Sequence, residues 1–319
     1  MIRRIAAALV LLVGIAAVGA SAQEWPTKQP VKIVVPFTAG SATDVAGRIV
    51  FEQVGRQLGQ SFVFENRGGA GTSLGVGMVA KADPDGYTLL VNSTSQVVIA
   101  STQKLPFSVA DDFVGISGLA DIPFVVVTHP TYKSMKDVID AGKKPGGIFY
   151  GTNGPGSSGH LFMEALRLAA GYPTTHVPFR GTVEALTEVI AGRIDMFPGP
   201  ALNAIPLSKD GKLSALAVSS PKRLALMPEV ATLAEIGLPK AQYQFWVGSF
   251  APAKTPRAIV ERLNREVVAA LKVKEVADKI IALGGSTMPM TPAEFDAFVK
   301  KELALNAEIV KASGYQPAQ

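Results

Sequence analysis

Residues 31–44 read VKIVVPFTAGSATD and contain, in order, the parts of a strand–loop–helix unit. The opening VKIVV is apolar and rich in β-branched residues, which is typical of a strand buried on both faces. Pro36 ends this strand because it has no N–H to give to the ladder. Ser41 and Asp44 have the capping-box spacing that marks a helix start. The unit therefore aims unpaired backbone N–H groups and the positive end of a helix dipole at whatever lies above the loop.

A second unit of the same kind lies well downstream. Residues 147–151 read GIFYG, a short strand, and residues 152–158 read TNGPGSS, a loop of small and polar residues before another helical run. Neither this loop nor residues 38–41 contains Lys or Arg. The two loops together predict two lobes that face one anion, held mainly by backbone amides and only secondarily by a side-chain cation.

Strand-like and helical runs alternate along the chain, which predicts βαβ units and mostly parallel sheets. Residues 87–91 read YTLLV, a buried strand, and residues 92–95 read NSTS, which we interpret as an all-polar loop after it. In such sheets ligands bind beyond the C-terminal ends of the strands. Ser93 and Thr94 are therefore candidate ligand-binding residues.

The chain has 319 residues, enough for about two domains of ~150 residues each. We expect residues 23–120 to form the first part of one lobe and residues 121–242 to form the second lobe. Residues 243–319 are then expected to return to the first lobe. This organisation places a ligand cleft between the two lobes.

Residues 1–22 have the features of a secretory signal peptide. Arg3 and Arg4 form its charged start, residues 5–18 form an apolar stretch that is short for a membrane span, and residues 20–22, ASA, form a small-residue cleavage site. We expect cleavage after Ala22 and a periplasmic location, with an uncleaved anchor as the alternative. The sequence has no cysteine, so we expect neither disulfides nor a lipid on a cysteine at the cleavage site.

Charge and motif spacing argue against several other functions. The net charge is only +5 and Lys and Arg do not gather into a stripe, which is not typical of nucleic-acid binding. The chain lacks a phosphate-binding Gly-Lys-Ser/Thr loop, and its glycines near residue 70 have the wrong spacing for a dinucleotide fingerprint. Three scattered histidines without cysteine give no metal-binding spacing. We therefore expect no cofactor and no metal.

Residues 71–75, GTSLG, match the G-x-S-x-G pattern of a hydrolase nucleophile elbow around Ser73. That elbow needs a strand running directly into the serine, followed later by an acid and a histidine. Here a glycine-rich turn precedes Ser73, and the histidines, His129, His160 and His176, all lie before the last third of the chain. We expect no enzyme, and a secreted serine hydrolase remains an alternative.

Two side chains outside the loops have open interpretations. Arg180 follows a predicted strand of the second lobe, where its guanidinium either takes a carboxylate or lies at the surface. His160 either donates into the cleft or is a structural residue at the start of its helix.

The chain resembles the extracytoplasmic solute receptors of tripartite tricarboxylate transporters, also called the Bug receptor family. The resemblance runs from Trp25 nearly to the C-terminus and rests on many short motifs in order. These are VVPF (34–37) with Gly40 and Asp44, ENR (65–67) with GAG (69–71), PDGYTLL (84–90), GHL (159–161), HVPFRG (176–181), LAV (216–218), and APA (251–253) with Thr255 and Pro256.

The resemblance implies an α/β, two-lobed periplasmic binding protein of type II-like form, each lobe a mostly parallel sheet flanked by helices. Family members hold a ligand carboxylate with the first strand–helix loop of each lobe, here residues 37–41 and 152–158. Together with the candidates above, the expected ligand-binding residues are Phe37, Thr38, Ala39, Gly40, Ser41, Asp44, Ser93, Thr94, Thr152, Asn153, Gly156, Ser157, Ser158, His160, Arg180 and Phe197.

The sequence departs from the family pattern at two places near the cleft. Thr38 and Ala39 stand where the family often has Pro or Gly, and residues 197–200, FPGP, replace a more usual Phe-Asp type. We expect these departures to affect the part of the site that meets the ligand's non-carboxylate end.

The function implied is a periplasmic receptor that captures a small organic carboxylate and delivers it to the integral membrane permease subunits of a tripartite transporter. We expect it to act as a monomer, without nucleic acid. A ligand-sensing module for a signalling partner is a further alternative, since the sequence does not separate sensing from transport.

Overall fold

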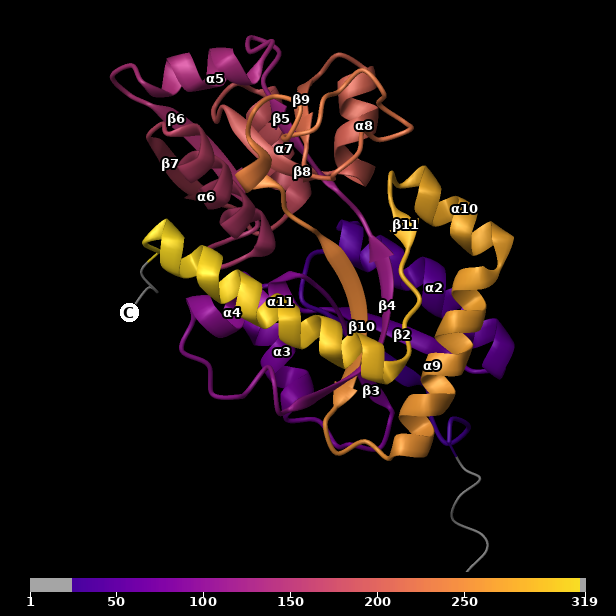
Figure 1. The fold of residues 1–319 in the computed structure, drawn as a ribbon. Coiled ribbons are helices and arrows are strands. Elements are labelled where there is room, and N and C mark those ends of the chain that lie inside the picture. The colour runs from indigo at the N-terminus through magenta and orange to yellow at the C-terminus, as the bar shows by residue number, and fades with distance from the viewer. Residues whose placement is uncertain (1–24, 316–319) are drawn as a thin grey trace, which may run out of the picture.

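A computed structural model describes residues 25–315 as two β-sheets, each flanked by helices (Figure 1). The expected signal peptide, residues 1–22, lies outside the described residues. We call each sheet with its helices a lobe. Across the described range, no helix combines the length and apolar character needed to cross a membrane.

The first sheet has six strands in the order β11-β4-β10-β3-β1-β2. Their bounds are β1 Val31–Val35, β2 Phe62–Asn66, β3 Thr88–Ser93, β4 Phe113–Asp121, β10 Trp246–Pro252 and β11 Ser286–Thr287. The second sheet has five strands in the order β7-β6-β8-β5-β9. Their bounds are β5 Phe124–Thr128, β6 Ile148–Thr152, β7 Thr174–Pro178, β8 Met196–Pro200 and β9 Ser214–Val218.

Both sheets are mixed, which corrects the expectation of mostly parallel sheets. β1 runs parallel to β2 and β3, and β6 runs parallel to β7 and β8. By contrast, β10 is antiparallel to β3 and β4, and β5 is antiparallel to β8 and β9. The parallel parts come from βαβ units. The antiparallel parts arise because the chain leaves the first lobe through β4 and returns to it through β10.

The helices cover the faces of the sheets (Figure 1). In the first lobe they are α2 Ala42–Leu58, α3 Ser73–Ala80, α4 Ser95–Thr102, α9 Arg257–Lys272, α10 Lys274–Ala282 and α11 Pro292–Ser313, with the short 3₁₀ turn η1 Ala70–Thr72. In the second they are α5 Met135–Gly142, α6 Ser158–Ala170, α7 Thr182–Ile190 and α8 Ala201–Lys209, and the turn η2 Pro239–Ala241 precedes β10.

The two strand–loop–helix units form as expected. β1 ends at Val35, directly before Pro36, and Ser41 caps α2 by accepting a hydrogen bond from Asp44 N at 3.3 Å. In the second lobe Ser157 caps α6 in the same way by accepting from His160 N at 3.3 Å. Each helix therefore begins immediately after its loop, at the C-terminal edge of its sheet.

The expected polar loop at residues 92–95 is wrong. Asn92 and Ser93 belong to β3, Ser95 opens α4, and all of these side chains are fully buried. β3 and α4 are therefore separated by Thr94 alone. Hydrogen bonds within the segment stabilise this tight turn: Asn92 Nδ2 donates to Gln96 Oε1 at 2.8 Å, and Ser93 Oγ accepts from Ser95 N at 3.3 Å.

Two crossing segments join the lobes. The β4–β5 connection and the chain that enters β10 lie side by side, with Ile122 N donating to Phe245 O at 2.9 Å. Phe124 packs against Phe245 with ring centroids 4.6 Å apart. The C-terminal helix α11 lies along the first sheet and reaches α6 of the second lobe, where Arg167 Nη2 donates to Ser313 O at 3.3 Å (Figure 1).

Candidate functional site

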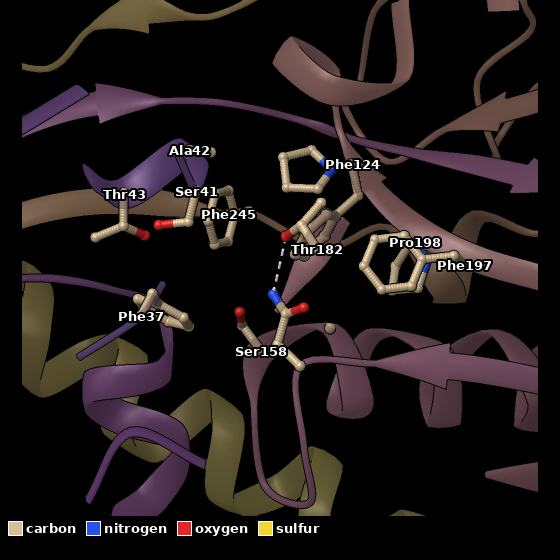
Figure 2. Close-up of a pocket in the computed structure, with 13 residues that line it drawn as sticks. Phe37, Ser41, Ala42, Thr43, Phe124, Ser158, Thr182, Phe197, Pro198 and Phe245 are labelled. Carbon is tan, nitrogen blue, oxygen red and sulfur yellow. Dashed lines mark hydrogen bonds between the residues drawn. The ribbon is translucent and has the colours of Figure 1, made fainter. Parts of the chain in front are cut away.

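Three helices begin around one small cavity between the lobes, which we call the inner cavity (Figure 2). Its volume is about 10 Å³, room for roughly one water molecule. It is lined by Phe37, Ser41, Ala42, Thr43, Phe124, Asn153, Ser158, Gly159, Thr182, Phe197, Pro198, Pro200 and Phe245. The first turns of α2, α6 and α7 thus present the positive ends of their dipoles to one point.

The first turns of α2 and α6 keep free backbone donors at this cavity. In α2 the capping serine takes only Asp44 N, and no group in the described chain accepts from Ala42 N or Thr43 N. In α6, Gly159 N is likewise without an acceptor there. Since an unpaired buried amide is unfavourable, these donors favour an anionic or carbonyl oxygen between them.

Asn153 adds a polar side chain from the second-lobe loop. Its Nδ2 donates to Thr182 Oγ1 at 3.3 Å, whereas its buried Oδ1 has no hydrogen-bond partner within the described residues. A buried polar atom left without a partner is unfavourable, so this oxygen favours a donor from a ligand or an ordered water.

The rest of the inner cavity is apolar. Four phenylalanines and two prolines form its walls, and none of the described residues that line it carries a charged side chain. Apolar walls lower the local dielectric and strengthen any hydrogen bond made by the helix amides. The arrangement therefore suits an anion held by backbone donors and helix dipoles.

A larger space adjoins the inner cavity, and we call it the outer chamber. Its volume is about 630 Å³, within the range of small-molecule sites. Phe37 and Asn153 line both spaces. The first lobe contributes Thr38, Asn66 and residues 68–71, and the second contributes Gly154, Pro155, Pro178, Phe179, Arg180 and Glu184. Arg180, exposed to solvent, brings a cation to this chamber and has no ion pair within residues 25–315.

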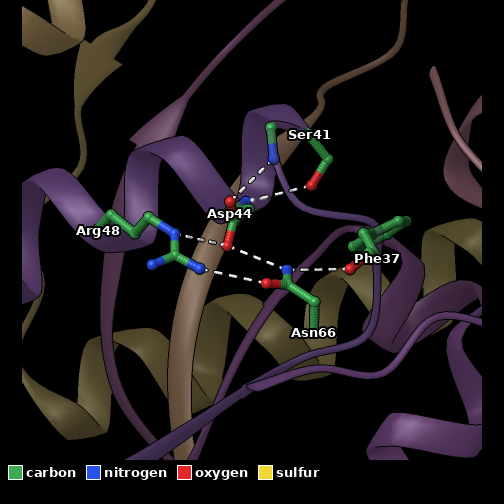
Figure 3. Close-up of polar contacts among 6 residues, drawn as sticks. Phe37, Ser41, Asp44, Arg48 and Asn66 are labelled. Carbon is green, nitrogen blue, oxygen red and sulfur yellow. Dashed lines mark hydrogen bonds and ion pairs between the residues drawn. The ribbon is translucent and has the colours of Figure 1, made fainter. Parts of the chain in front are cut away.

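The carboxylate of Asp44 holds the first loop in place through hydrogen bonds (Figure 3). Its carboxylate accepts from Gly40 N at 2.9 Å, from Arg48 Nε at 3.0 Å and from Asn66 Nδ2 at 3.0 Å. Asn66 Nδ2 also donates to Phe37 O at 3.0 Å. Burial raises the pKa of Asp44, but these hydrogen bonds together hold that pKa below its usual value. Asp44 thus fixes the loop and lines neither cavity.

His160 supports the second loop in a similar way. Its Nδ1 accepts from Gly156 N at 3.1 Å, and its ring stacks on His176 with centroids 4.0 Å apart. Burial lowers the pKa of His160, and burial together with the neighbouring imidazole lowers the pKa of His176 to about 3. Both rings are therefore neutral at pH 7. The ring of His160 faces the loop backbone, and the residue lines neither cavity.

The structure brings some of the predicted residues together at the two spaces and not others. Those that line them are Phe37, Thr38, Ser41, Asn153, Ser158, Arg180 and Phe197. Those that do not are Ala39, Gly40, Asp44, Ser93, Thr94, Thr152, Gly156, Ser157 and His160. Most of this second group still shapes the loops: Thr152 Oγ1 donates to Gly154 O, and Thr94 Oγ1 accepts from Trp246 N beside the crossing segment.

Sequence reasoning missed several lining residues. Ala42, Thr43 and Gly159 follow the predicted loops directly, and the helix starts at Ser41 and Ser157 were the signal that would have found them. Phe124 and Phe245 come from the two crossing segments, and no local pattern indicates that they meet.

Ser73 has no catalytic partner in the described chain. It opens α3 after the turn η1, and its exposed Oγ donates to Ala70 O at 2.9 Å. One ring nitrogen of each histidine bonds elsewhere: His129 Nδ1 to Thr131, His160 Nδ1 to Gly156 and His176 Nε2 to Thr152. Within residues 25–315 no three His, Cys, Asp or Glu side chains form a group able to hold a metal ion.

Comparison with known proteins gives consistent matches. The family model described as "Tripartite tricarboxylate transporter family receptor" matches residues 46–315. Protein BugT of Bordetella pertussis is 32% identical over 321 residues, covering 98% of each chain. The solved structure of Rpa4515 of R. palustris with adipate is 30% identical with a TM-score of 0.87, covering 92% of this chain and 100% of that one. MatC of Rhodopseudomonas palustris with bound malate is 29% identical with a TM-score of 0.83, covering 89% and 99%.

Proposed function

The chain belongs to the tripartite tricarboxylate transporter receptor family, and from this premise we propose that it captures a small organic carboxylate between its lobes and delivers it to a membrane permease. The proposal includes the lobe boundaries near residues 120 and 242. Structures of two similar proteins hold adipate and malate, both dicarboxylates, which supports this ligand class.

The observation that carries the proposal is the set of free amides at Ala42, Thr43 and Gly159 around a cavity without charged lining. A hydrogen bond to a charged group contributes roughly 1.5–3 kcal/mol, so three such amides can replace one arginine. The carboxylate would enter between the helix starts while the lobes are open and would be held at the inner cavity once they close, with the body of the ligand in the outer chamber.

Ligand binding is coupled to closure in this proposal. The free amides come from α2 in one lobe and from α6 in the other, so a carboxylate reaches all of them only when the lobes are together. A ligand that contacts both lobes selects the closed form. The permease would then recognise the closed, loaded receptor.

Delivery to a permease requires export, and we propose cleavage after Ala22 with release of a monomer into the periplasm. The charged, apolar and small-residue regions of residues 1–22 support this. Intact-mass measurement of the periplasmic protein should give a chain that starts at Gln23, and recovery of the full-length chain from membranes would contradict it.

A thermal-shift screen tests the ligand class. Malate, adipate, tricarboxylates, aromatic acids and amino acids are compared with the methyl esters or amides of the same acids. A ligand at a hundred times its dissociation constant adds about 2.7 kcal/mol to the free energy of unfolding. We expect stabilisation by at least one acid and none by its uncharged derivative. Equal stabilisation by acid and ester would exclude the carboxylate as the recognised group.

Arg180→Ala is expected to weaken carboxylate binding about tenfold, equivalent to ~1.4 kcal/mol. Arg180 lies in the outer chamber and not in the inner cavity, so its guanidinium contacts the distal part of the ligand and adds to the amides. Titration calorimetry measures the effect, with Arg193→Ala as the control, since Arg193 is paired with Glu188 and lines neither space. Complete loss of binding in Arg180→Ala would make the site an arginine clamp.

A further inference from the structure

One hydrogen-bonded contact joins the lobes directly at the inner cavity. Ser95 is the first residue of α4 in the first lobe, and Ser158 is the first residue of α6 in the second. Ser158 N donates to Ser95 Oγ at 3.0 Å, and Ser95 Oγ donates to Ser158 Oγ at 3.2 Å. Ser95 is fully buried and Ser158 is 3% exposed.

The direction of these bonds determines what Ser158 can do. The Ser95 hydroxyl accepts from the helix amide and gives its own proton to Ser158 Oγ. A hydroxyl has one proton and two lone pairs. Ser158 Oγ is therefore an acceptor toward Ser95 and keeps its proton for another partner. Ser158 lines the inner cavity, as Figure 2 shows, whereas Ser95 lines neither space.

The position of Ser95 is itself fixed from within the first lobe. Ser95 N donates to Ser93 Oγ at 3.3 Å in the tight turn between β3 and α4. Its hydroxyl therefore meets Ser158 only when the second lobe is closed against the first. Opening the lobes would separate the two serines and release the Ser158 hydroxyl to rotate.

We propose that Ser95 is a positioning residue, which stabilises the closed form and turns the Ser158 hydroxyl as a hydrogen-bond donor toward the bound carboxylate. The assignment of the anion rests on the proposed function, whereas the lobe-to-lobe contact does not depend on it. The contact between Ser95 and Ser158 thus forms when the lobes close, and the same contact orients the Ser158 hydroxyl toward the ligand.

Affinity measurements test the ligand part, with malate and adipate as probes in titration calorimetry. We expect Ser95→Ala to weaken binding by roughly 2- to 10-fold, the range of one ordinary hydrogen bond, and Ser95→Thr, which keeps the hydroxyl, to restore part of the loss. In a Ser158→Ala background the same change should have a smaller effect. An equal effect in both backgrounds, or no effect in either, would overturn the proposal.

A matched control separates this role from general destabilisation. Ser249 is also fully buried, and its Oγ donates to Ser117 O inside the first sheet. Ser249→Ala should change thermal stability about as much as Ser95→Ala while leaving affinity unchanged. A parallel loss of affinity in Ser249→Ala would show that lost stability alone explains the Ser95 result.

The closure part is tested without ligand. The chain contains no cysteine, so Lys81→Cys on the first lobe and Thr187→Cys on α7 allow two spin labels at exposed positions. We expect Ser95→Ala to shift the inter-label distances toward longer values, and an unchanged distribution would overturn the proposal. If the unmodified receptor binds none of the acids in the thermal-shift screen, the ligand assignment fails, and the distance measurement still decides the role of Ser95 in closure.

Discussion

Gly71→Ala is expected to lower ligand affinity about a hundredfold or more while each lobe stays folded. Gly71 lies in the turn η1 of the first lobe and has a φ of 60°. A Cβ there would lie 2.3 Å from Pro155 O and 2.7 Å from Gln103 Nε2. Pro155 belongs to the second-lobe loop, and its carbonyl is backbone, so the clash is relieved only by moving the lobes apart.

The size of the effect follows from what the ligand would lose. Lobes held apart deprive the carboxylate of the donors of one lobe. Losing even one or two hydrogen bonds to a charged group removes about 3 kcal/mol, which is about a hundredfold in affinity. Titration calorimetry with the acid found in the ligand screen measures this directly.

Gly59→Ala is the matched control. Gly59 ends α2 in the same lobe with a φ of 61°, and a Cβ there meets nothing within 4 Å. Both changes place alanine in the left-handed region at a cost of about 1–2 kcal/mol of stability. Only Gly71→Ala introduces a clash between lobes. Equal affinities for the two variants would show that closure as seen here is not required for binding.

The units that form the site were predictable from the sequence because their signals are local. The β-branched run before Pro36, the capping serines at residues 41 and 157 and the charge-free loops all act within a few residues. They predicted where two helix N-termini face a cleft. The close ligand approach expected at Gly40 stays a prediction: a Cβ there would meet no atom of the chain within 4 Å, and its N–H is bonded to Asp44.

The rest of the site depends on contacts between distant segments. Phe124 and Phe245 meet only because the chain crosses between the lobes twice, and crossing strands have no sequence signature of their own. Polarity also misled the prediction of a loop at residues 92–95, because the hydroxyls of Ser93 and Thr94 accept from backbone N–H groups in a buried turn. A run of polar residues indicates an exposed loop only when its side chains do not form hydrogen bonds with one another or with nearby backbone.

Asp44→Ala is expected to destabilise the protein by about 2–4 kcal/mol. The change removes the buried carboxylate that accepts from Gly40 N, Arg48 Nε and Asn66 Nδ2, so three hydrogen bonds, one of them to a cation, are lost. Asp278→Ala is the control, since Asp278 likewise forms an ion pair with a residue four positions away on its helix, Lys274, but is exposed. Surface changes of this kind stay within ~0.5 kcal/mol of stability. Chemical denaturation at pH 7 measures both variants.

The pH dependence of stability separates the contribution of the Asp44 charge from that of the side chain's shape. The pKa of Asp44 is lowered in the folded protein, so its contribution to stability is fully present above the unfolded-state value, near 3.8, and is lost as the pH falls through the folded-state value. Asp44→Asn keeps the shape without the charge. The difference in free energy of unfolding between Asp44→Asn and the original protein should therefore become smaller as the pH falls below about 4. A difference that stays constant with pH would contradict the assignment.

Asp44 also connects stability to ligand binding, because its hydrogen bonds fix the loop that ends at the free amides of Ala42 and Thr43. In Asp44→Ala these amide donors are still present, but the loop no longer holds them in one orientation. Ordering the loop when the ligand binds then costs conformational entropy. We therefore expect weaker carboxylate binding at temperatures where the variant is still fully folded, measured by calorimetry beside Asp278→Ala. Unchanged affinity in a destabilised Asp44→Ala variant would mean that the first-lobe loop is held in place by the closed second lobe and not by Asp44.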